Sequence, residues 1–461
     1  MKNISIEELN KVVGGEIVIG SELATFTSVC IDSRKVTENA LFVALVGKRT
    51  NGHNYVVQTL KNGASVALVS DSNIDKIETI DKSCKVIIKV SNTLVAMQAL
   101  AKHYRNKFLI PTVAITGSVG KTTTKEMCYS VLSGKFNTYK NFGNLNSDIG
   151  MPLAVFGLKK EHNVAIFEMG MSNKGEIETM SDIANPYIAI ITNIGISHIE
   201  NLKTKENILK AKLEIETGLT PDGIMLLNGD DKMLAPLKGK LAHQVLLYGI
   251  KNENCDFFAT KIKRKDTYTT FSLQTPYGSF DFKLNSIGSH NVSNAVVALA
   301  TGICLGISKK ELAFGLESYG TDNLRQKIFK ADDMIIIDDS YNAAPDSMIA
   351  ALDILKTTNS NRKIAVLSDM LELGDKTESS HIKIGKLASS FCDFLLCYGD
   401  NSRLYLASGN ENILHFSSLE ECAEFLLTLA KSGDAILFKG SHSMKTFECM
   451  ELFLKGRNIQ K

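Results

Sequence analysis

The sequence predicts an α/β protein of three domains, and three observations lead to this fold class. The chain has 461 residues, more than one hydrophobic core usually organises. Most apolar runs are short, do not alternate with polar residues and precede a helical pattern, which is typical of buried parallel strands. One stretch within residues 241–286 does alternate and predicts an antiparallel hairpin. We expect the domains at residues 1–105, 106–319 and 320–461.

The N-terminal domain is expected to be a small α/β unit. Strands are predicted for "ALFVALV" (residues 40–46) and "SVALVS" (65–70), and "VVQTLKNGA" between them has a helical pattern. A longer helix is predicted for "TLVAMQALAKHYRNKF" (93–108), and Pro111 marks the boundary to the next domain.

The central domain opens with "VAITGSVGKTTTKEM", from Val113 to Met127, which predicts a strand, a glycine loop and a helix start. Free backbone N–H groups at a helix N-terminus bind anions, and glycines let the backbone approach the anion closely. Lys121 would then reach the terminal phosphates of a nucleotide, and the Thr122 hydroxyl would bind Mg²⁺. The loop lacks the first glycine of G-x-x-x-x-G-K-[ST], so a glycine-rich turn with a solvated lysine is the alternative. The flanking strand and helix favour the nucleotide.

Other polar residues of the central domain follow strands or lie on helices. Glu168 ends the strand "NVAIFEM", where a sheet meets its ligand, and a carboxylate there is a natural Mg²⁺ ligand. His198 follows the next strand, and a lone histidine is more often structural. Lys212 lies on a predicted helix, where the alternative is a solvated face. Asn291 and Asn294 could contact a base or cap a helix, and spacing alone favours capping.

The C-terminal domain is predicted as a doubly wound, Rossmann-like sheet from four βα repeats, with strands "MIIID", "KIAVLS", "FLLCYG" and "AILFKG". The first strand leads through Asp338 and Asp339 to a helix that begins at Pro345. Asp339 could accept hydrogen bonds from a ribose or hold a metal-bound water. Gly440 and Ser441 open another helix and form a second candidate anion site at the same sheet edge.

Composition and charge exclude several classes of protein. Lys and Arg number 52 against 50 Asp and Glu, so no broad basic surface is available for a nucleic acid. The nine cysteines include no C-x-x-C pair, which favours thiols in a reducing cytoplasm over disulfides or zinc. The first fifteen residues carry acids in place of an export signal, and "IANPYIAIITNIGIS" is too interrupted to span a membrane. We expect a cytoplasmic monomer that binds small molecules.

A series of segments resembles a known family. In chain order these segments are "TGSVGKTTT", "FEMGMS", "TNIGISHIENL", "KAKLEI", "GSHNVSNAVVAL", "DDSYNAAPDSM", "SDMLELG" and "KGSHSMK". They resemble the motifs of the ATP-dependent Mur ligases of peptidoglycan synthesis, including a shortened phosphate-binding loop. "DSRKVTENALFVALVGKRTNGHNYV" is similar to the N-terminal module with which members acting late in the pathway hold the UDP end of the substrate.

The resemblance implies roles for individual residues. The implied ATP site comprises Gly117, Ser118, Val119, Gly120, Lys121, Thr122 and Thr123, with Asn291 at the adenine, Arg325 at the phosphates, and Asp339, Tyr341 and Asn342 around ribose and phosphates. Two Mg²⁺ ions are implied at Thr122, Glu168, His198 and a carbamylated Lys212. The implied catalytic residues are Lys121, Lys212 and His198, and the implied UDP contacts are Ser33 and Arg34.

The resemblance also implies a reaction. "SYNAAPDSM" looks like the variant in the family member that adds D-alanyl-D-alanine to UDP-N-acetylmuramoyl-tripeptide through an acyl phosphate. One alternative is the relative that adds L-lysine or diaminopimelate to the UDP-dipeptide, but its D-N-P-R string is absent. Further alternatives are folylpolyglutamate synthase, which would not need the N-terminal module, and a nucleotide-binding regulator without catalysis. His442 stands where an arginine is expected from the family.

Overall fold

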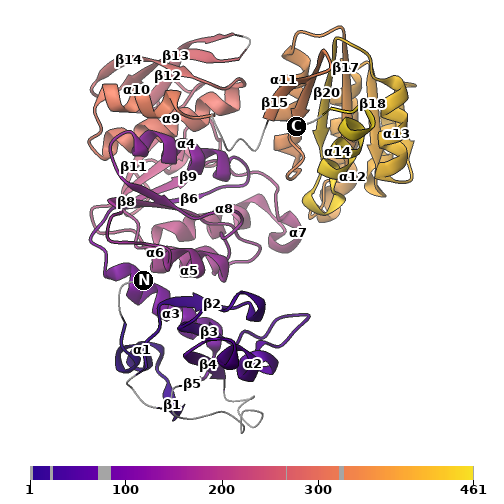
Figure 1. Cartoon of the computed structure of the whole chain (residues 1–461). Coiled ribbons are helices and arrows are strands. Elements are labelled where there is room, and N and C mark those ends of the chain that lie inside the picture. The colour runs from indigo at the N-terminus through magenta and orange to yellow at the C-terminus, as the bar shows by residue number, and fades with distance from the viewer. Residues whose placement is uncertain (1–3, 21–23, 71–84, 266, 321–326, 460–461) are drawn as a thin grey trace. The chain divides into compact units, whose positions relative to one another are not determined.

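The computed structural model describes residues 4–20, 24–70, 85–265, 267–320 and 327–459. The chain divides into two compact units. The first contains Met1–Thr116, Lys135–Ile190 and Leu213–Met225, and the second contains Gly117–Gly134, Ile191–Lys212 and Leu226–Lys461. The described residues form three β-sheets with helices packed on them (Figure 1), which confirms the predicted α/β class.

The N-terminal sheet has five strands in the order β1-β5-β4-β3-β2. Its strands are β1 (Glu16–Ile19), β2 (Ser28–Cys30), β3 (Ala40–Val43), β4 (Val66–Ser70) and β5 (Val86–Val90). Strands β2 to β5 are parallel, and β1 pairs antiparallel with β5. The two strands predicted from the apolar runs are β3 and β4, which are buried along their whole length.

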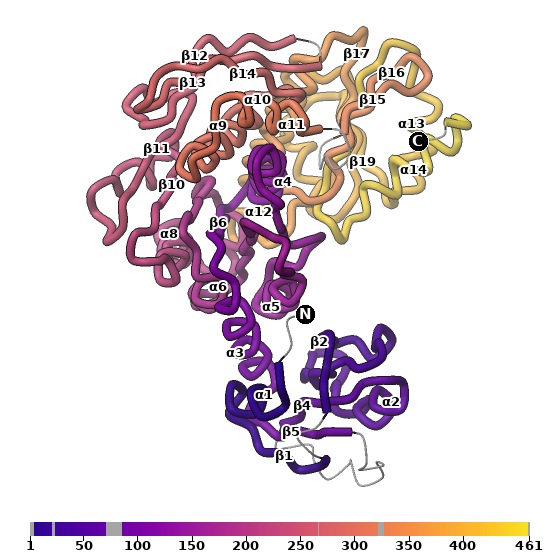
Figure 2. The backbone as a smooth tube through the Cα atoms, turned by 60° about the vertical axis from the view of Figure 1, so that its left-hand side comes forward, coloured from indigo at the N-terminus to yellow at the C-terminus, as the bar shows by residue number. Residues whose placement is uncertain are grey.

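Three helices accompany this sheet: α1 (Ile6–Val13), α2 (Val56–Lys61) and α3 (Thr93–Asn106). Ser5 caps α1 by accepting a hydrogen bond from the Glu8 amide, and Gly14 ends the helix in the left-handed conformation. Helix α1 packs against α3 (Figure 2), and α3 also contacts β3 and β4. The predicted helix over residues 93–108 is thereby confirmed as α3, two residues shorter.

The second sheet has nine strands in the order β14-β13-β12-β11-β10-β9-β6-β8-β7. The strands are β6 (Thr112–Thr116), β7 (Thr138–Lys140), β8 (Val164–Glu168), β9 (Ile188–Ile191), β10 (Ile224–Asn228), β11 (Gln244–Gly249), β12 (Phe257–Arg264), β13 (Thr269–Thr275) and β14 (Gly278–Leu284). Strands β6, β8 and β7 pair in parallel. Strands β12, β13 and β14 are antiparallel, so the predicted hairpin is confirmed as β13 and β14.

Seven α-helices lie in the described part of the chain between β6 and β15: α4 (Lys121–Ser133), α5 (Gly150–Val155), α6 (Glu176–Ala184), α7 (Ile199–Leu202), α8 (Lys205–Leu213), α9 (Ser289–Cys304) and α10 (Lys309–Glu317). Ser308 and Glu311 form a capping box that starts α10. In the second unit α4 packs against α9 and α10 (Figure 1), and α9 also packs on β11 and β12. Helix α4 is thus held at the end of the glycine loop that precedes it.

The C-terminal sheet has six strands in the order β15-β16-β20-β17-β18-β19. The strands are β15 (Lys327–Ala331), β16 (Met334–Asp338), β17 (Arg362–Ser368), β18 (Phe394–Tyr398), β19 (Ile413–Phe416) and β20 (Asp434–Lys439). All pairs are parallel except the edge pair β15 and β16. The four predicted strands correspond to β16, β17, β18 and β20, while β15 and β19 were not predicted.

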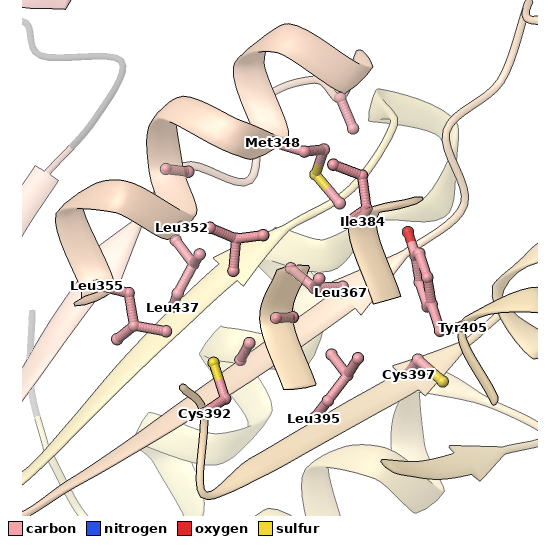
Figure 3. Packing of buried hydrophobic residues seen from close by; sticks show 14 of the residues in the cluster. Met348, Leu352, Leu355, Leu367, Ile384, Cys392, Leu395, Cys397, Tyr405 and Leu437 are labelled. Atoms are coloured by element: carbon pink, nitrogen blue, oxygen red, sulfur yellow. The ribbon is translucent and has the colours of Figure 1, made fainter. Parts of the chain in front are cut away.

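Two hydrophobic cores cover the two faces of this sheet. Helices α11 (Pro345–Thr357) and α12 (Thr377–Ser389) supply one core, in which Met348, Leu352 and Leu355 of α11 pack over Leu367 and Leu437 (Figure 3). Helices α13 (Leu419–Leu429) and α14 (Thr446–Gly456) supply the other core. Helices on both faces of a mostly parallel sheet confirm the predicted doubly wound arrangement.

Two further features concern the helices and the cysteines of the described residues. None of their helices is both long enough and apolar enough to cross a membrane. Eight cysteines lie in the described ranges, and all eight are free thiols.

Candidate functional site

The predicted phosphate-binding loop joins β6 to α4. Gly117 and Gly120 have φ angles of 148° and 87°, a backbone conformation that side chains with a Cβ rarely adopt. A Cβ atom on Gly117 would lie 1.9 Å from Thr192 Oγ1. The loop therefore needs glycine at this position both for its backbone conformation and for its close packing.

A second loop, which follows β9, holds the glycine loop in place. The Ser118 amide donates to the Asn193 carbonyl at 3.1 Å, and the Val119 amide donates to Asn193 Oδ1 at 2.9 Å. Thr192 Oγ1 donates to the Val119 carbonyl at 2.6 Å, and the Gly195 amide donates to Ser118 Oγ at 2.8 Å. These contacts fix the backbone of the loop. Sequence reasoning did not select Thr192 or Asn193, although both come directly after a buried strand.

Lys121 and Thr122 are the first two residues of α4. Lys121 Nζ donates to the Gly117 carbonyl at 2.8 Å and to the Ser118 carbonyl at 3.4 Å, so its ammonium group lies over the loop. Thr122 is buried. A positive charge and a helix N-terminus thus meet at one loop, which suits a bound phosphate.

Lys212 does not lie on a solvated helix face, which was the alternative that its sequence pattern allowed. It lies in α8 and is only 2% exposed. Burial lowers the pKa of Lys212 well below its ordinary value, and the positive charge of Lys121 lowers it further. The two lysines therefore lie within electrostatic reach of each other in the second unit.

Glu168 ends β8 in the first unit and is 1% exposed. In the parallel register it lies beside Ile115, two residues before Gly117 in the chain. Asn146 Nδ2 donates to Glu168 Oε1 at 2.9 Å, and Asn141 Oδ1 accepts from the Glu168 amide at 2.9 Å. A buried carboxylate that accepts a hydrogen bond from Asn146, at the end of a strand whose backbone Asn141 binds, has the chemistry of a cation ligand.

His198 precedes α7 and has a positive φ of 62°. Its Nδ1 atom lies 2.7 Å from Oε2 of Glu372, which also has a positive φ, of 63°. The hydrogen bond from His198 lowers the pKa of Glu372. Glu372, in the segment "SDMLELG", was not predicted as a site residue, although its segment was among those that carried the family resemblance.

A cavity of about 700 Å³ lies within the second unit. Its walls come from segments that are far apart in the chain, among them the glycine loop, the start of α9, the loop after β16 and the loop after β20. Predicted site residues in its lining are Ser118, Val119, Gly120, Lys121, Thr123, His198, Asn291, Asp339, Tyr341 and Asn342. The structure thus brings together most of the predicted nucleotide-binding residues that it describes.

The amides of Asn291 and Asn294 do not cap α9, in contrast to the interpretation that spacing favoured. The helix begins at Ser289 after Gly288, and no side chain caps it. Asn291 is buried, and its Nδ2 donates to Ser286 Oγ at 2.9 Å and to the Ile287 carbonyl at 2.8 Å. Asn294 Oδ1 accepts from Thr124 Oγ1 of α4 at 3.2 Å.

The loop after β16 is held by a lysine that sequence reasoning did not select. Lys439 Nζ lies 2.6 Å from Asp339 Oδ2 and donates to the Asn342 carbonyl at 2.9 Å. Tyr341 packs against the ring of His442, with the ring centroids 5.4 Å apart. Lys439 ends the otherwise apolar strand "AILFK" and begins "KGSHSMK", a segment that carried the family resemblance, but it was given no role.

The predicted UDP contacts lie in the first unit. Ser33 and Arg34 belong to the short 3-10 helix η1 (Ser33–Lys35). The Arg34 side chain is 85% exposed and hydrogen-bonds to both carboxylate oxygens of Asp32, which lowers the pKa of that carboxyl to about 2. The guanidinium is thus oriented at the surface. Arg325, the predicted phosphate ligand, lies outside the described residues.

The donors predicted for Mg²⁺ suit a hard cation, since they include the Glu168 carboxylate and the Thr122 hydroxyl. In the described ranges, no group of three or more His, Cys, Asp or Glu side chains gathers as a metal site. The predicted set contains only two residues of these types, Glu168 and His198, so this finding does not test it.

Three protein-family models match successive parts of the chain. Family models described as "Mur ligase family, catalytic domain", "Mur ligase middle domain" and "Mur ligase, glutamate ligase domain" match residues 25–105, 115–302 and 325–442. These three matches agree with the predicted three-domain fold.

Two curated relatives are named UDP-N-acetylmuramoyl-tripeptide--D-alanyl-D-alanine ligase. The protein of Bacillus subtilis strain 168 is 35% identical over 439 residues, which cover 93% of each chain. That of Escherichia coli K12 is 33% identical over 448 residues, which cover 96% of each chain. Among solved structures, MurF from Acinetobacter baumannii matches with a TM-score of 0.91 at 31% identity over 99% of each chain. MurF from Thermotoga maritima in complex with ADP matches with a TM-score of 0.83 at 27% identity, over 93% of this chain and 97% of that one.

Proposed function

Because the chain belongs to the Mur ligase family, we propose that it is an ATP-dependent ligase that joins D-alanyl-D-alanine to UDP-N-acetylmuramoyl-tripeptide. The product is the UDP-N-acetylmuramoyl-pentapeptide precursor of peptidoglycan. The observation that carries this proposal is the 33–35% identity, over almost the full length, to relatives named for that reaction. The cavity beside the glycine loop provides a place for the nucleotide.

The reaction has two steps. A carboxylate oxygen at the end of the tripeptide attacks the γ-phosphorus of ATP, which forms an acyl phosphate and releases ADP. The amine of the dipeptide then attacks the acyl carbon, phosphate leaves, and the nitrogen loses a proton as the amide forms. Phosphoryl transfer needs alignment and charge neutralisation more than covalent help from the protein. The Lys121 ammonium and the N-terminus of α4 supply both at the nucleotide phosphates.

Two Mg²⁺ ions complete the proposed site, and they would neutralise charge on the phosphate oxygens during transfer. Thr122, Glu168, His198 and Lys212 are the residues that would hold them. The buried Glu168 carboxylate, fixed by Asn146, suits this role. Lys212 would serve as a carbamate, which carries a negative charge in place of the ammonium charge. Its burial supports this assignment, because a buried ammonium is costly unless it is paired or modified.

Other assignments extend the proposal to the rest of the chain. We assign Asn291 to the adenine, Asp339, Tyr341 and Asn342 to the ribose and phosphates, and Arg325 to a phosphate. Thr123 joins the other residues of the glycine loop at the phosphates, and Ser33 and Arg34 contact the UDP group. The proposed domains are residues 1–105, 106–319 and 320–461. We propose a cytoplasmic monomer, and the free thiols of the described cysteines are consistent with a reducing compartment.

The test is a product assay with the purified protein, ATP and MgCl₂. One mixture contains UDP-N-acetylmuramoyl-tripeptide and D-alanyl-D-alanine, and the other contains the UDP-dipeptide with L-lysine or diaminopimelate. We expect pentapeptide, ADP and phosphate from the first mixture alone, measured by mass spectrometry and phosphate release. Product from the second mixture only, or from neither, would refute the proposal. Lys121→Ala serves as the matched inactive control, because it removes the charge at the phosphates.

A further inference from the structure

Lys439 is a buried charge at the end of an inner strand of the C-terminal sheet. It is the last residue of β20, which lies between β16 and β17, and every residue of β20 is buried. Lys439 itself is 1% exposed. A lysine ammonium in such a place is costly unless its hydrogen bonds are satisfied by nearby acceptors.

The acceptors of Lys439 all belong to one short segment, residues 339–342. Nζ lies 2.6 Å from Asp339 Oδ2, 2.9 Å from the Asn342 carbonyl and 3.4 Å from the Asp339 carbonyl. An ammonium group has three protons to donate, so these three acceptors match its capacity. The Asp339 amide also donates to the Phe438 carbonyl at 3.0 Å, which fastens the start of the segment to β20.

The segment that Lys439 holds forms part of the cavity wall. Asp339, Tyr341 and Asn342 line the cavity, as does Lys439 itself. The segment lies between β16 and α11, and outside those elements its conformation depends on contacts such as these. The hydrogen bonds of Lys439 therefore restrain residues that line the cavity.

We propose that Lys439 is a positioning residue for the nucleotide, which acts by fixing residues 339–342 against the end of β20. The inference rests on the proposed function, since it assigns a supporting residue to the same ATP site. It adds a residue for which neither the sequence pattern nor the comparisons gave a role. Lys439 acts through Asp339 and the Asn342 carbonyl, and these residues face the nucleotide.

The first test is Lys439→Met, which keeps most of the length of the side chain and removes the charge. Loss of a charged hydrogen bond in a buried setting is expected to raise the Kd for ADP and the KM for ATP roughly tenfold. The KM values for D-alanyl-D-alanine and UDP-N-acetylmuramoyl-tripeptide are expected to stay within about twofold, because residues 339–342 are assigned to the nucleotide. Uniform loss of folded protein would change no KM, so a rise in the KM for ATP alone indicates a positioning role. Hydrogen exchange of residues 339–344 should rise in the variant.

The same strand offers a matched control. Asp434 begins β20 and forms a bidentate ion pair with Arg362 of β17, at 2.7 and 2.9 Å. Neither residue lines the cavity. Arg362→Met therefore removes a buried ion pair from the same domain and is expected to lower the thermal midpoint without changing the ADP Kd.

A second pair of variants covers the case in which Lys439→Met does not fold. Asp339→Asn combined with Lys439→Met removes both charges and leaves no unpaired ion. If Lys439 acts through the segment, adding Lys439→Met to the Asp339→Asn variant should change the ADP Kd by less than about threefold. An unchanged ADP Kd in Lys439→Met alone would overturn the inference. So would an equal rise of the ADP Kd when Lys439→Met is introduced into the wild type and into the Asp339→Asn variant. A wild-type protein that forms no pentapeptide would instead refute the proposed function.

Discussion

Lys212 illustrates how a single residue resists prediction from a helical pattern. The pattern around it is compatible with a solvated face, yet the side chain is 2% exposed. A pattern of one helix cannot reveal burial that other elements create, so the residue was distinguished only by the family resemblance. The same limit applies to Lys439, because the ion pair with Asp339 joins residues that are 100 positions apart.

Replacement of Lys212 by alanine tests the carbamate assignment. We expect Lys212→Ala to lower kcat by about a hundredfold or more, since it removes a charged group from the phosphate site. Acetate or formate should restore part of the activity, because a small carboxylate can occupy the place of the missing anion. The measurement is kcat at increasing acid concentration.

Lys210→Ala is the matched control for this experiment. Lys210 lies in the same helix α8 and is exposed. Its replacement should leave kcat and the response to acetate as in the wild type. Full activity of Lys212→Ala in the absence of acid would contradict the assignment.

At the scale of elements, strands with a continuous apolar run were the easiest to predict. Strands β3, β4, β16, β17, β18 and β20 were all recognised, and so was the hairpin of β13 and β14 with its alternating pattern. The unpredicted strands are short or partly exposed. Strand β15 has the sequence "KIFKA" with only its last residue buried, and β19 has only four residues. Edge strands such as β15 receive their conformation from pairing, which a local pattern does not record.

The glycine loop is the element whose conformation is most open to test. Gly117→Ala places a Cβ 1.9 Å from Thr192 Oγ1 at a φ of 148°. The loop must shift to relieve this overlap, and misplacement by about 1 Å can cost about a hundredfold in rate. We expect a fall of that order in kcat/KM for ATP, measured by steady-state kinetics of ADP formation.

Gly175→Ala separates backbone strain from the overlap. Gly175 precedes α6 with a φ of 90°, and an added Cβ would meet no atom within 4 Å. This variant should lose about 1 kcal/mol of folding free energy and keep the kcat/KM for ATP of the wild type. Equal kinetic effects of the two variants would show that the contact with Thr192 has no special role.

At the scale of the whole molecule, the sequence predicted the class of each sheet and the three-domain arrangement, and most of the nucleotide-binding residues that it singled out line the cavity. It did not predict which residues hold the loops, such as Asn193 at the glycine loop and Glu372 at His198. These contacts join the ends of different strands or loops, and they form only when the chain is folded. The charge balance argued against a nucleic-acid partner, and the cysteine pattern argued against disulfides and zinc. Neither feature indicated which ligand the protein binds.

Nucleotide binding should leave a defined pattern of protection along the chain. We expect ADP to slow hydrogen exchange at residues 117–123 and 339–344, because the lining of the cavity includes both segments. Strands β3 and β4 of the N-terminal sheet should show no change. The measurement is exchange mass spectrometry with and without ADP, and protection confined to the N-terminal sheet would contradict the assignment of the cavity.

The two ends of β20 carry opposite charges, and each end has its own partner. Asp434 is aligned with Arg362 in the parallel register, and Phe438, just before Lys439, is aligned with Asp338. An apolar strand between apolar neighbours could slide by two residues and still bury its side chains. Here such a slip would separate both ion pairs at once and leave two charges buried without partners. The charged ends of β20 therefore fix its register in the sheet. A sheet assembled in a shifted register would be less stable than the native one, whether or not a ligand is bound.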